Sequence, residues 1–296
     1  MSAFLQTIVD GIGRGSTYAL LALGITVIFG VMHLVNFAHA ELITVGAYVA
    51  YALSNAGVGW WLLVPAIVGA AVVASVAVER GVFRWVRGAS PFTMLLASFA
   101  VERLAQALWG VFVGPEKRSF AGPEWAFNNV EVGGIRFEVL DLVTIAATAV
   151  VLVLTVFVFR RTLFGISVRG ASEDFDAARL MGVRATRVIA GAFAFAGFLA
   201  GVAAVLILIR TPSAEPTMGS DYLVKAVVAA IIGGLGSFSG AVVGGLALGL
   251  AEVALRSYLP DGLWERLTDA VVFVLVAALF IARPQGLFTV RTAERV

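Results

Sequence analysis

The sequence has no cysteine, and histidine and lysine are each represented by only two residues. Without cysteine the chain can form neither a disulfide nor a thiolate metal site. His33 and His39 do not have the His-x-x-x-His spacing of a metal-binding helix, and neither Lys117 nor Lys225 belongs to a G-x-x-x-x-G-K-[ST] phosphate loop. These absences argue against a metalloenzyme, against any bound cofactor and against a chain that hydrolyses ATP itself.

The composition is that of a membrane protein. Of the 296 residues, 60% are hydrophobic and 14% are charged, and the mean hydropathy of +0.97 lies far above that of soluble domains. The apolar runs reach the ~17–25 residues that cross a bilayer as a helix. We therefore expect an all-α integral membrane protein, a polytopic bundle of transmembrane helices in a single domain over residues 1–296. The net charge of +2 comes from arginines in particular connecting segments, and so indicates membrane orientation rather than nucleic-acid binding.

The apolar runs predict about eight or nine spans, some of them broken or re-entrant. The run at 223–255 is too long for one simple span and is interrupted by GGLGSFSG. Each glycine costs a helix about 1 kcal/mol relative to alanine, so we expect the helix to break at Gly233, Gly234, Gly236 and Gly240. The expected spans are 17–32, after a short interfacial helix at 4–12, then 37–53, 60–78, 92–112, 142–159, 188–209, 223–255 and 270–282.

The charges of the connecting segments predict their sides of the membrane. Arginines are enriched at 79–91 and at 160–187, which places both segments in the cytoplasm by the positive-inside rule. The segment 114–141 has no basic excess and is expected on the extracytoplasmic side. Glycines four residues apart, at Gly197 and Gly201 and at Gly245 and Gly249, predict closely packed helices.

The segment 160–187 combines six arginines with three acids between two apolar runs. Ser172 is suited to cap a short helix here, and Gly182 to end it. Such a helix is marginal alone in water, so lipid headgroups, the flanking spans or another protein must hold it. Its apolar residues recur three or four positions apart, as on one helix face, at Val168, Ala171, Phe175, Ala178 and Met181.

Asn36, His39 and Glu41 form a polar cluster at the start of a span. In one interpretation, the helix beginning near Phe37 starts inside the bilayer, is capped by Asn36, and turns its N-terminal N–H groups towards a passing carboxylate. In the other, the cluster is an ordinary interfacial turn in which His39 bonds to the backbone. Both interpretations stay open.

Three stretches, at 23–50, 169–206 and 221–252, resemble in order the branched-chain amino acid permeases of bacterial ABC importers. They read LGITVIFGVMHLVNFAHAELITVGAYVA, RGASEDFDAARLMGVRATRVIAGAFAFAGFLAGVAAVL and DYLVKAVVAAIIGGLGSFSGAVVGGLALGLAE. The chain is most similar to the first of the two permease subunits of the leucine/isoleucine/valine type. Relatives in this family import urea, short amides and other amino acids, so these substrates remain alternatives.

The resemblance implies a multi-pass protein of the bacterial cytoplasmic (inner) membrane that works by alternating access. Its partners would be a second permease subunit, two cytoplasmic ATP-binding subunits and an extracytoplasmic amino-acid-binding protein. The short helix of segment 160–187 would sit in a groove of the ATPase. The implied coupling positions are Ala171, Glu173, Ala177, Ala178, Leu180 and Gly182.

The sequence departs from the family pattern at Gly170, where alanine is usual, and at Ala40, where glycine is usual.

An ion-coupled secondary transporter is the competing hypothesis. Glu102 lies beside Arg103 in the middle of a span, where charge costs about 2.5–3.5 kcal/mol, and so needs a partner inside the bundle. A membrane-embedded enzyme is disfavoured because no nucleophile–base constellation is present. The candidate ion carriers would be Glu41, Glu102, Glu252 and Asp269.

Overall fold

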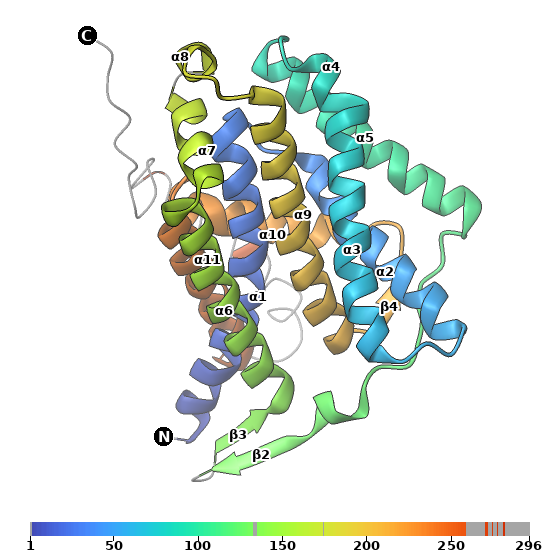
Figure 1. Cartoon of the computed structure of the whole chain (residues 1–296). Helices are drawn as coiled ribbons and strands as arrows, with labels where there is room; N and C mark the ends of the chain where they lie inside the picture. Colours follow the sequence, from blue (N-terminus) through green and yellow to red (C-terminus); the bar gives the residue numbers. More distant parts are fainter. Residues whose placement is uncertain are drawn as a thin grey trace.

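The computed structural model describes residues 2–132, 135–173 and 175–258, together with positions 270, 271, 274, 277 and 281. It is an all-α membrane protein in which six of the described helices are long and apolar enough to cross a bilayer (Figure 1). These are α1 (Ser2–Met32), α3 (Trp60–Val78), α5 (Pro91–Phe112), α6 (Val139–Arg161), α9 (Ala185–Arg210) and α11 (Phe238–Tyr258). The span that contains α3 continues to Val86, through a π-helical turn at Glu79–Phe83 and the short helix α4 (Arg84–Val86).

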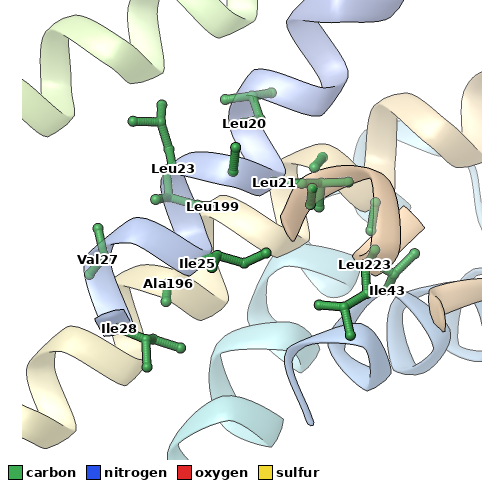
Figure 2. Close-up of a cluster of buried hydrophobic side chains, with 14 of the residues drawn as sticks. Leu20, Leu21, Leu23, Ile25, Val27, Ile28, Ile43, Ala196, Leu199 and Leu223 are labelled. Atoms are coloured by element: carbon green, nitrogen blue, oxygen red, sulfur yellow. The ribbon is translucent and has the colours of Figure 1, made fainter. Parts of the chain in front are cut away.

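The centre of the bundle is formed by α1 and α9. In the most apolar 18-residue stretches of α1 and α9, 83% and 78% of the residues are buried, whereas only 17–28% are buried in the corresponding stretches of α3, α5 and α6. Figure 2 shows part of this core, in which side chains of α1 lie beside Ala196 and Leu199 of α9. The outer helices thus present much of their apolar surface to lipid or to another subunit.

Glycines allow the central helices to approach closely, as their four-residue spacing predicts. A Cβ added at Gly245 of α11 would lie 2.4 Å from the backbone nitrogen of Ala19 in α1, and one at Gly249 would lie 2.3 Å from Gly15. In α9, a Cβ at Gly201 would lie 2.8 Å from Cα of Val68 in α3. These helices therefore touch backbone to backbone.

Two further helices are shorter. α2 (Ala40–Asn55) and α10 (Met218–Gly233) have 16 residues each, which corresponds to about 24 Å, less than the ~30 Å hydrocarbon core. Their first turns meet, because a Cβ on Gly219 would lie 2.1 Å from the carbonyl oxygen of Ala40. Neither helix is long enough to cross a bilayer alone.

The helix breaks within the predicted glycine-rich stretch, since α10 ends at Gly233 and α11 begins at Phe238. Between them Gly234 and Gly236 have φ of +95° and +92°, which favour glycine. Gly240, also predicted to break the helix, lies instead inside α11. A Cβ on Gly233 would lie 2.0 Å from the carbonyl oxygen of Gly240. The glycine-rich sequence thus both reverses the chain and lets the two helices touch.

The prediction of a separate interfacial helix at 4–12 is wrong, because α1 is continuous from Ser2. Packing explains the difference. A Cβ on Gly11 would lie 2.7 Å from the side chain of Leu250, and one on Gly13 would lie 2.4 Å from the carboxylate of Asp141. Tertiary contacts with α11 and α6 hold this glycine-rich part of α1 in the helix.

The connecting segments gather at two opposite ends (Figure 1). α4, α7 (Leu163–Glu173) and α8 (Phe175–Leu180) lie at one end, which is the end that the arginines predict to be cytoplasmic. The antiparallel hairpin of β2 (Asn129–Val132) and β3 (Ile135–Glu138) lies at the other. Also in the segment 114–141 are β1 (Arg118–Ser119), which pairs with β4 (Ser213–Ala214), and a 3-10 turn at Glu124–Phe127.

Candidate functional site

The arginine-rich segment forms two helices, α7 and α8, rather than one. The prediction that Ser172 caps a helix is wrong, because Ser172 lies inside α7. The start of α7 is set by Thr162, whose hydroxyl accepts a hydrogen bond from the backbone N–H of Gly165 at 3.2 Å. A Cβ on Gly165 would clash with the backbone of Phe159, so α7 turns back tightly against the end of α6.

The end of α8 matches the prediction. Gly182 has φ +85° and donates to the carbonyl of Arg179 at 3.0 Å, and Val183 donates to the carbonyl of Ala178, also at 3.0 Å. This pair of bonds is the Schellman motif that a C′ glycine makes possible. Gly182 therefore ends the helix as expected.

The predicted apolar stripe is buried in part. Val168, Ala171 and Ala178 are 4%, 1% and 8% exposed, and so hold the segment against the bundle. Met181 is 85% exposed, because it lies past the last turn of α8, and its neighbour Leu180 is 89% exposed. Among the predicted coupling positions, Ala171 and Ala178 thus face inwards, whereas Ala177 and Leu180 face outwards. Glu173 is the last residue of α7.

An aromatic cluster links α7 to the helix break. Phe159, at the end of α6, is 2% exposed. Its ring centroid lies 5.9 Å from that of Phe164 in α7, 5.5 Å from Phe195 in α9 and 4.7 Å from Phe238, the first residue of α11. A Cβ on Gly191 would lie 2.5 Å from the Phe164 ring, so α7 also packs directly on α9. Packed side chains thus connect α7 with the residues that follow the glycine break.

The polar cluster at the start of α2 is buried. The chain reverses after α1 at His33, which has φ +53°. The side chain of Asn36 then accepts a hydrogen bond from the backbone N–H of Ala38 at 3.1 Å, and so caps the 3-10 turn Phe37–His39 that leads into α2. Its predicted capping role is confirmed.

His39 is 1% exposed, and its ring packs on the backbone of α1, where a Cβ on Gly24 would lie 2.7 Å from Nε2. Within the described part of the chain, neither ring nitrogen has a hydrogen-bond partner. The bond from His39 to the backbone that the interfacial-turn interpretation requires is therefore not formed. The imidazole is held in place by packing, and both of its nitrogens are buried.

Glu41 and Glu102 form a buried acid pair, 4% and 3% exposed. The side-chain nitrogen of Gln106 lies 3.4 Å from Oε1 of Glu41 and 3.3 Å from Oε1 of Glu102. Ser220 of α10 donates to the same oxygen of Glu102 at 2.6 Å. The prediction that Glu102 has a partner across helices is confirmed. Arg103 instead donates within its own helix, to Gln106 at 3.1 Å.

Sequence reasoning missed the partners of these groups. Gln106 lies four residues after Glu102 on the same helix face, and this spacing could have identified it. Ser220 and Phe238 carry no such local signal, because they reach the site only through the packing of α10 and α11. The remaining candidate ion carriers are separate, since Glu252 lies in another cluster beside α10 and Asp269 lies outside the described residues.

Comparison with known proteins places these features in a family. The chain is 32% identical to the high-affinity branched-chain amino acid transport system permease protein LivH of Escherichia coli K12, over 99% of this chain and 98% of the relative. It is 30% identical, with the same coverage, to the permease protein BraD of Pseudomonas aeruginosa, which has the corresponding description. The similarity to these two permeases extends along almost the whole length of the chain.

Among solved structures, an inward-facing conformation of a putative metal-chelate type ABC transporter has a similar fold, with a TM-score of 0.52 at 15% identity. The similarity covers 95% of this chain and 87% of that one. The family profile that describes the permease component of branched-chain amino acid transport systems matches residues 7–281. The chain therefore belongs to the family of branched-chain amino acid transport system permease components.

Proposed function

We propose that this chain is one transmembrane subunit of a binding-protein-dependent importer that moves branched-chain amino acids by alternating access. The full-length similarity to permeases described as transporting these amino acids supports the substrate class. ATP hydrolysis takes place in two partner subunits at the cytoplasmic end. A second permease subunit and an extracytoplasmic amino-acid-binding protein complete the assembly.

In this proposal α2 and α10 are half-spans that begin within the bilayer. Their 16-residue lengths and the contact between Gly219 and Ala40 support it. Together with the six long helices they give eight membrane segments. The predicted span at 270–282, most of which lies outside the described residues, would be a ninth. Asn36, His39 and Glu41 then lie along the substrate path, where polar groups of broken helices can contact a passing solute.

The observation that carries the coupling role is the contrast between the two sides of α8. Its inner side is anchored by Ala178, whereas Leu180 and Met181 are almost fully exposed beside the exposed Arg179 and Arg184. Exposed apolar residues rimmed by charge are typical of protein contacts. We assign this surface to the ATPase groove, with 160–187 as the cytoplasmic coupling segment. The segment 114–141 is the extracytoplasmic loop.

The aromatic cluster gives the coupling a mechanical route. When ATP closes the ATPase dimer, a displacement of α7 moves Phe164 against Phe159, and Phe159 moves against Phe238 at the start of α11. The adjacent glycines absorb the change in backbone angles, since glycine adopts both signs of φ. The half-span α10 then shifts relative to α2, which opens the path to one side of the membrane at a time.

The coupling surface is tested by purifying the tagged chain from its native membrane in mild detergent and identifying the bound proteins by mass. A phosphate-loop ATPase is expected with the native chain. It is lost when Leu180 and Met181 are both replaced by serine. Both side chains are exposed, so the change leaves the bundle folded. The matched control is Phe127→Ser, which removes a 58% exposed apolar side chain from the segment 114–141 and retains the ATPase.

An ion-coupled secondary transporter is the second candidate, because Glu41 and Glu102 share one amide nitrogen inside the bundle. Leucine uptake by cells with an ionophore present and ATP intact separates the two functions. Uptake survives for an ATP-driven importer and stops for an ion-coupled one. Alanine at Asn36 or His39 is expected to lower uptake without loss of assembly, and unchanged uptake would remove these residues from the path.

A further inference from the structure

A second polar site lies beside α10, away from the acid pair. It is a cavity of about 580 Å³ between α1, the end of α9, α10 and α11, which is within the ~300–1,000 Å³ range of small-molecule sites. Among the described lining residues five are basic and three are acidic. Charged side chains within a membrane bundle are costly and are typical of substrate pathways.

Glu252 of α11 is the centre of this site and is 2% exposed. Tyr18 donates to one of its carboxylate oxygens at 2.6 Å. The other oxygen contacts three cations, from Arg14 at 3.1 Å, Lys225 at 3.1 Å and Arg256 at 3.0 Å. We call these five residues the Glu252 cluster. One buried carboxylate thus holds three cationic groups at the edge of a cavity.

The two arginines retain donors that can bind a ligand. A guanidinium has five N–H donors, and the Arg14 and Arg256 side chains, 30% and 44% exposed, each give Glu252 one contact. Both line the cavity. Arginine binds carboxylates through two parallel hydrogen bonds, so the wall formed by these residues is suited to a carboxylate.

The remaining lining has the features needed for the rest of an amino acid. Glu215 and Asp221 supply carboxylates for an ammonium group, and Leu206, Ile207 and Met218 supply apolar surface. We propose that this cavity binds the zwitterionic, apolar amino acid substrate, with its carboxylate on Arg14 and Arg256. The proposal rests on the proposed function, because it assigns a site for the same substrate class.

The chain has no cysteine, so one introduced thiol is the only thiol that this subunit contributes. Val224→Cys places it at a lining position that is 45% exposed. In the assembled importer, the modification rates with a negatively charged and a positively charged methanethiosulfonate are compared. The control is Val130→Cys, equally exposed at 45% but on β2 outside the cavity. We expect the anion-to-cation rate ratio to be about tenfold higher at position 224 than at position 130.

Millimolar L-leucine is expected to slow modification at position 224 and not at position 130. Leucinamide, which lacks the carboxylate, is expected to protect neither. Adding Arg256→Gln to Val224→Cys lowers the rate ratio and removes the protection, and Arg14→Gln does the same. If leucine and leucinamide protect equally, or if neither protects, the proposed site is overturned and the cluster only joins the helices.

Leucine uptake by the wild-type importer is measured in parallel. A wild-type importer that takes up leucine while position 224 is unprotected contradicts the site and leaves the proposed function standing. An importer that takes up no leucine, although leucine and not leucinamide protects position 224, contradicts the function and leaves the carboxylate site standing.

Discussion

The two sides of α10 bury carboxylates in opposite ways. On one side the acid pair, Glu41 and Glu102, is held by the neutral donors Gln106 and Ser220. On the other side the single carboxylate of the Glu252 cluster is held by a hydroxyl and three cations. The first arrangement holds two carboxyl groups with neutral donors and the second holds one carboxylate with three cations, so one 16-residue helix separates two regions of different charge.

This contrast distinguishes the contributions of the two clusters. A neutral hydrogen bond in a folded protein contributes about 1 kcal/mol, whereas removing one member of a buried ion pair costs about 3–5 kcal/mol because its partner remains charged. The Glu252 cluster should therefore determine whether α1, α10 and α11 assemble. The acid pair should adjust the position of α10 at much lower cost.

The largest effect is expected for Glu252→Gln. The change leaves the partly exposed cations of Arg14, Lys225 and Arg256 around a neutral amide. Because solvent offsets part of the cost of a buried unpaired charge, the free energy of unfolding should fall by up to about 3 kcal/mol. Thermal unfolding of the purified chain in detergent measures it. A change below about 1 kcal/mol would show that the cluster contributes little to assembly, and the contrast with the acid pair would disappear.

The next effect is expected for Gly245→Ala, which tests the close contact that lets α1 reach Glu252. The new Cβ would lie 2.4 Å from the backbone of Ala19, and forcing extra atoms into a packed interior costs about 1–3 kcal/mol. Gly69→Ala in α3 is the matched control, since its Cβ would meet no atom within 4 Å. This control should raise stability by about 0.5–1 kcal/mol. Equal effects of both changes in thermal unfolding would contradict close packing.

A smaller effect is expected for Ser220→Ala in the acid pair. The change removes the donor 2.6 Å from Glu102 but leaves the amide of Gln106 in place. Thermal unfolding should report a loss of about 1 kcal/mol. A loss as large as that for Glu252→Gln would mean that the two sides of α10 do not differ in the predicted way.

The smallest effect is expected for Glu131→Gln, which breaks the exposed pair with Arg136 in the β2–β3 hairpin. Both side chains are more than half exposed, and such pairs contribute about 0–1 kcal/mol. The unfolding temperature should be unchanged within error. A shift comparable to that of Ser220→Ala would show that burial does not explain why these charged groups differ in their contribution to stability.

Much of the helix pattern was predictable because hydropathy is a local property. The predicted span at 60–78 coincides with α3, and the break in GGLGSFSG coincides with residues 234–237. The start of α7 was not predicted, because Thr162 and Ser172 are equally good caps by composition. Only the packing of Gly165 against Phe159 selects the earlier one.

The sequence allowed the polar residues of the candidate site to be identified more readily than the side chains that bind them. Asn36, Glu41, Glu102 and Glu252 could be identified because polar groups in apolar runs are conspicuous. Their partners could not, since Arg14 and Glu252 are 238 positions apart in the chain. The position of such a partner depends on helix crossings, which no local pattern encodes.

By itself, the sequence determined that the chain is a membrane bundle, which connecting segments are rich in arginine and where glycine interrupts a helix. Each of these follows from the transfer of individual residues between water and lipid or from local backbone freedom. Only the tertiary structure decided that α2 and α10 are short helices that meet, and that the buried acids divide into a hydrogen-bonded pair and a cation-bound centre. A buried charge is stabilised by whichever groups the folded bundle brings within about 3 Å, and hydropathy contains no information about that approach.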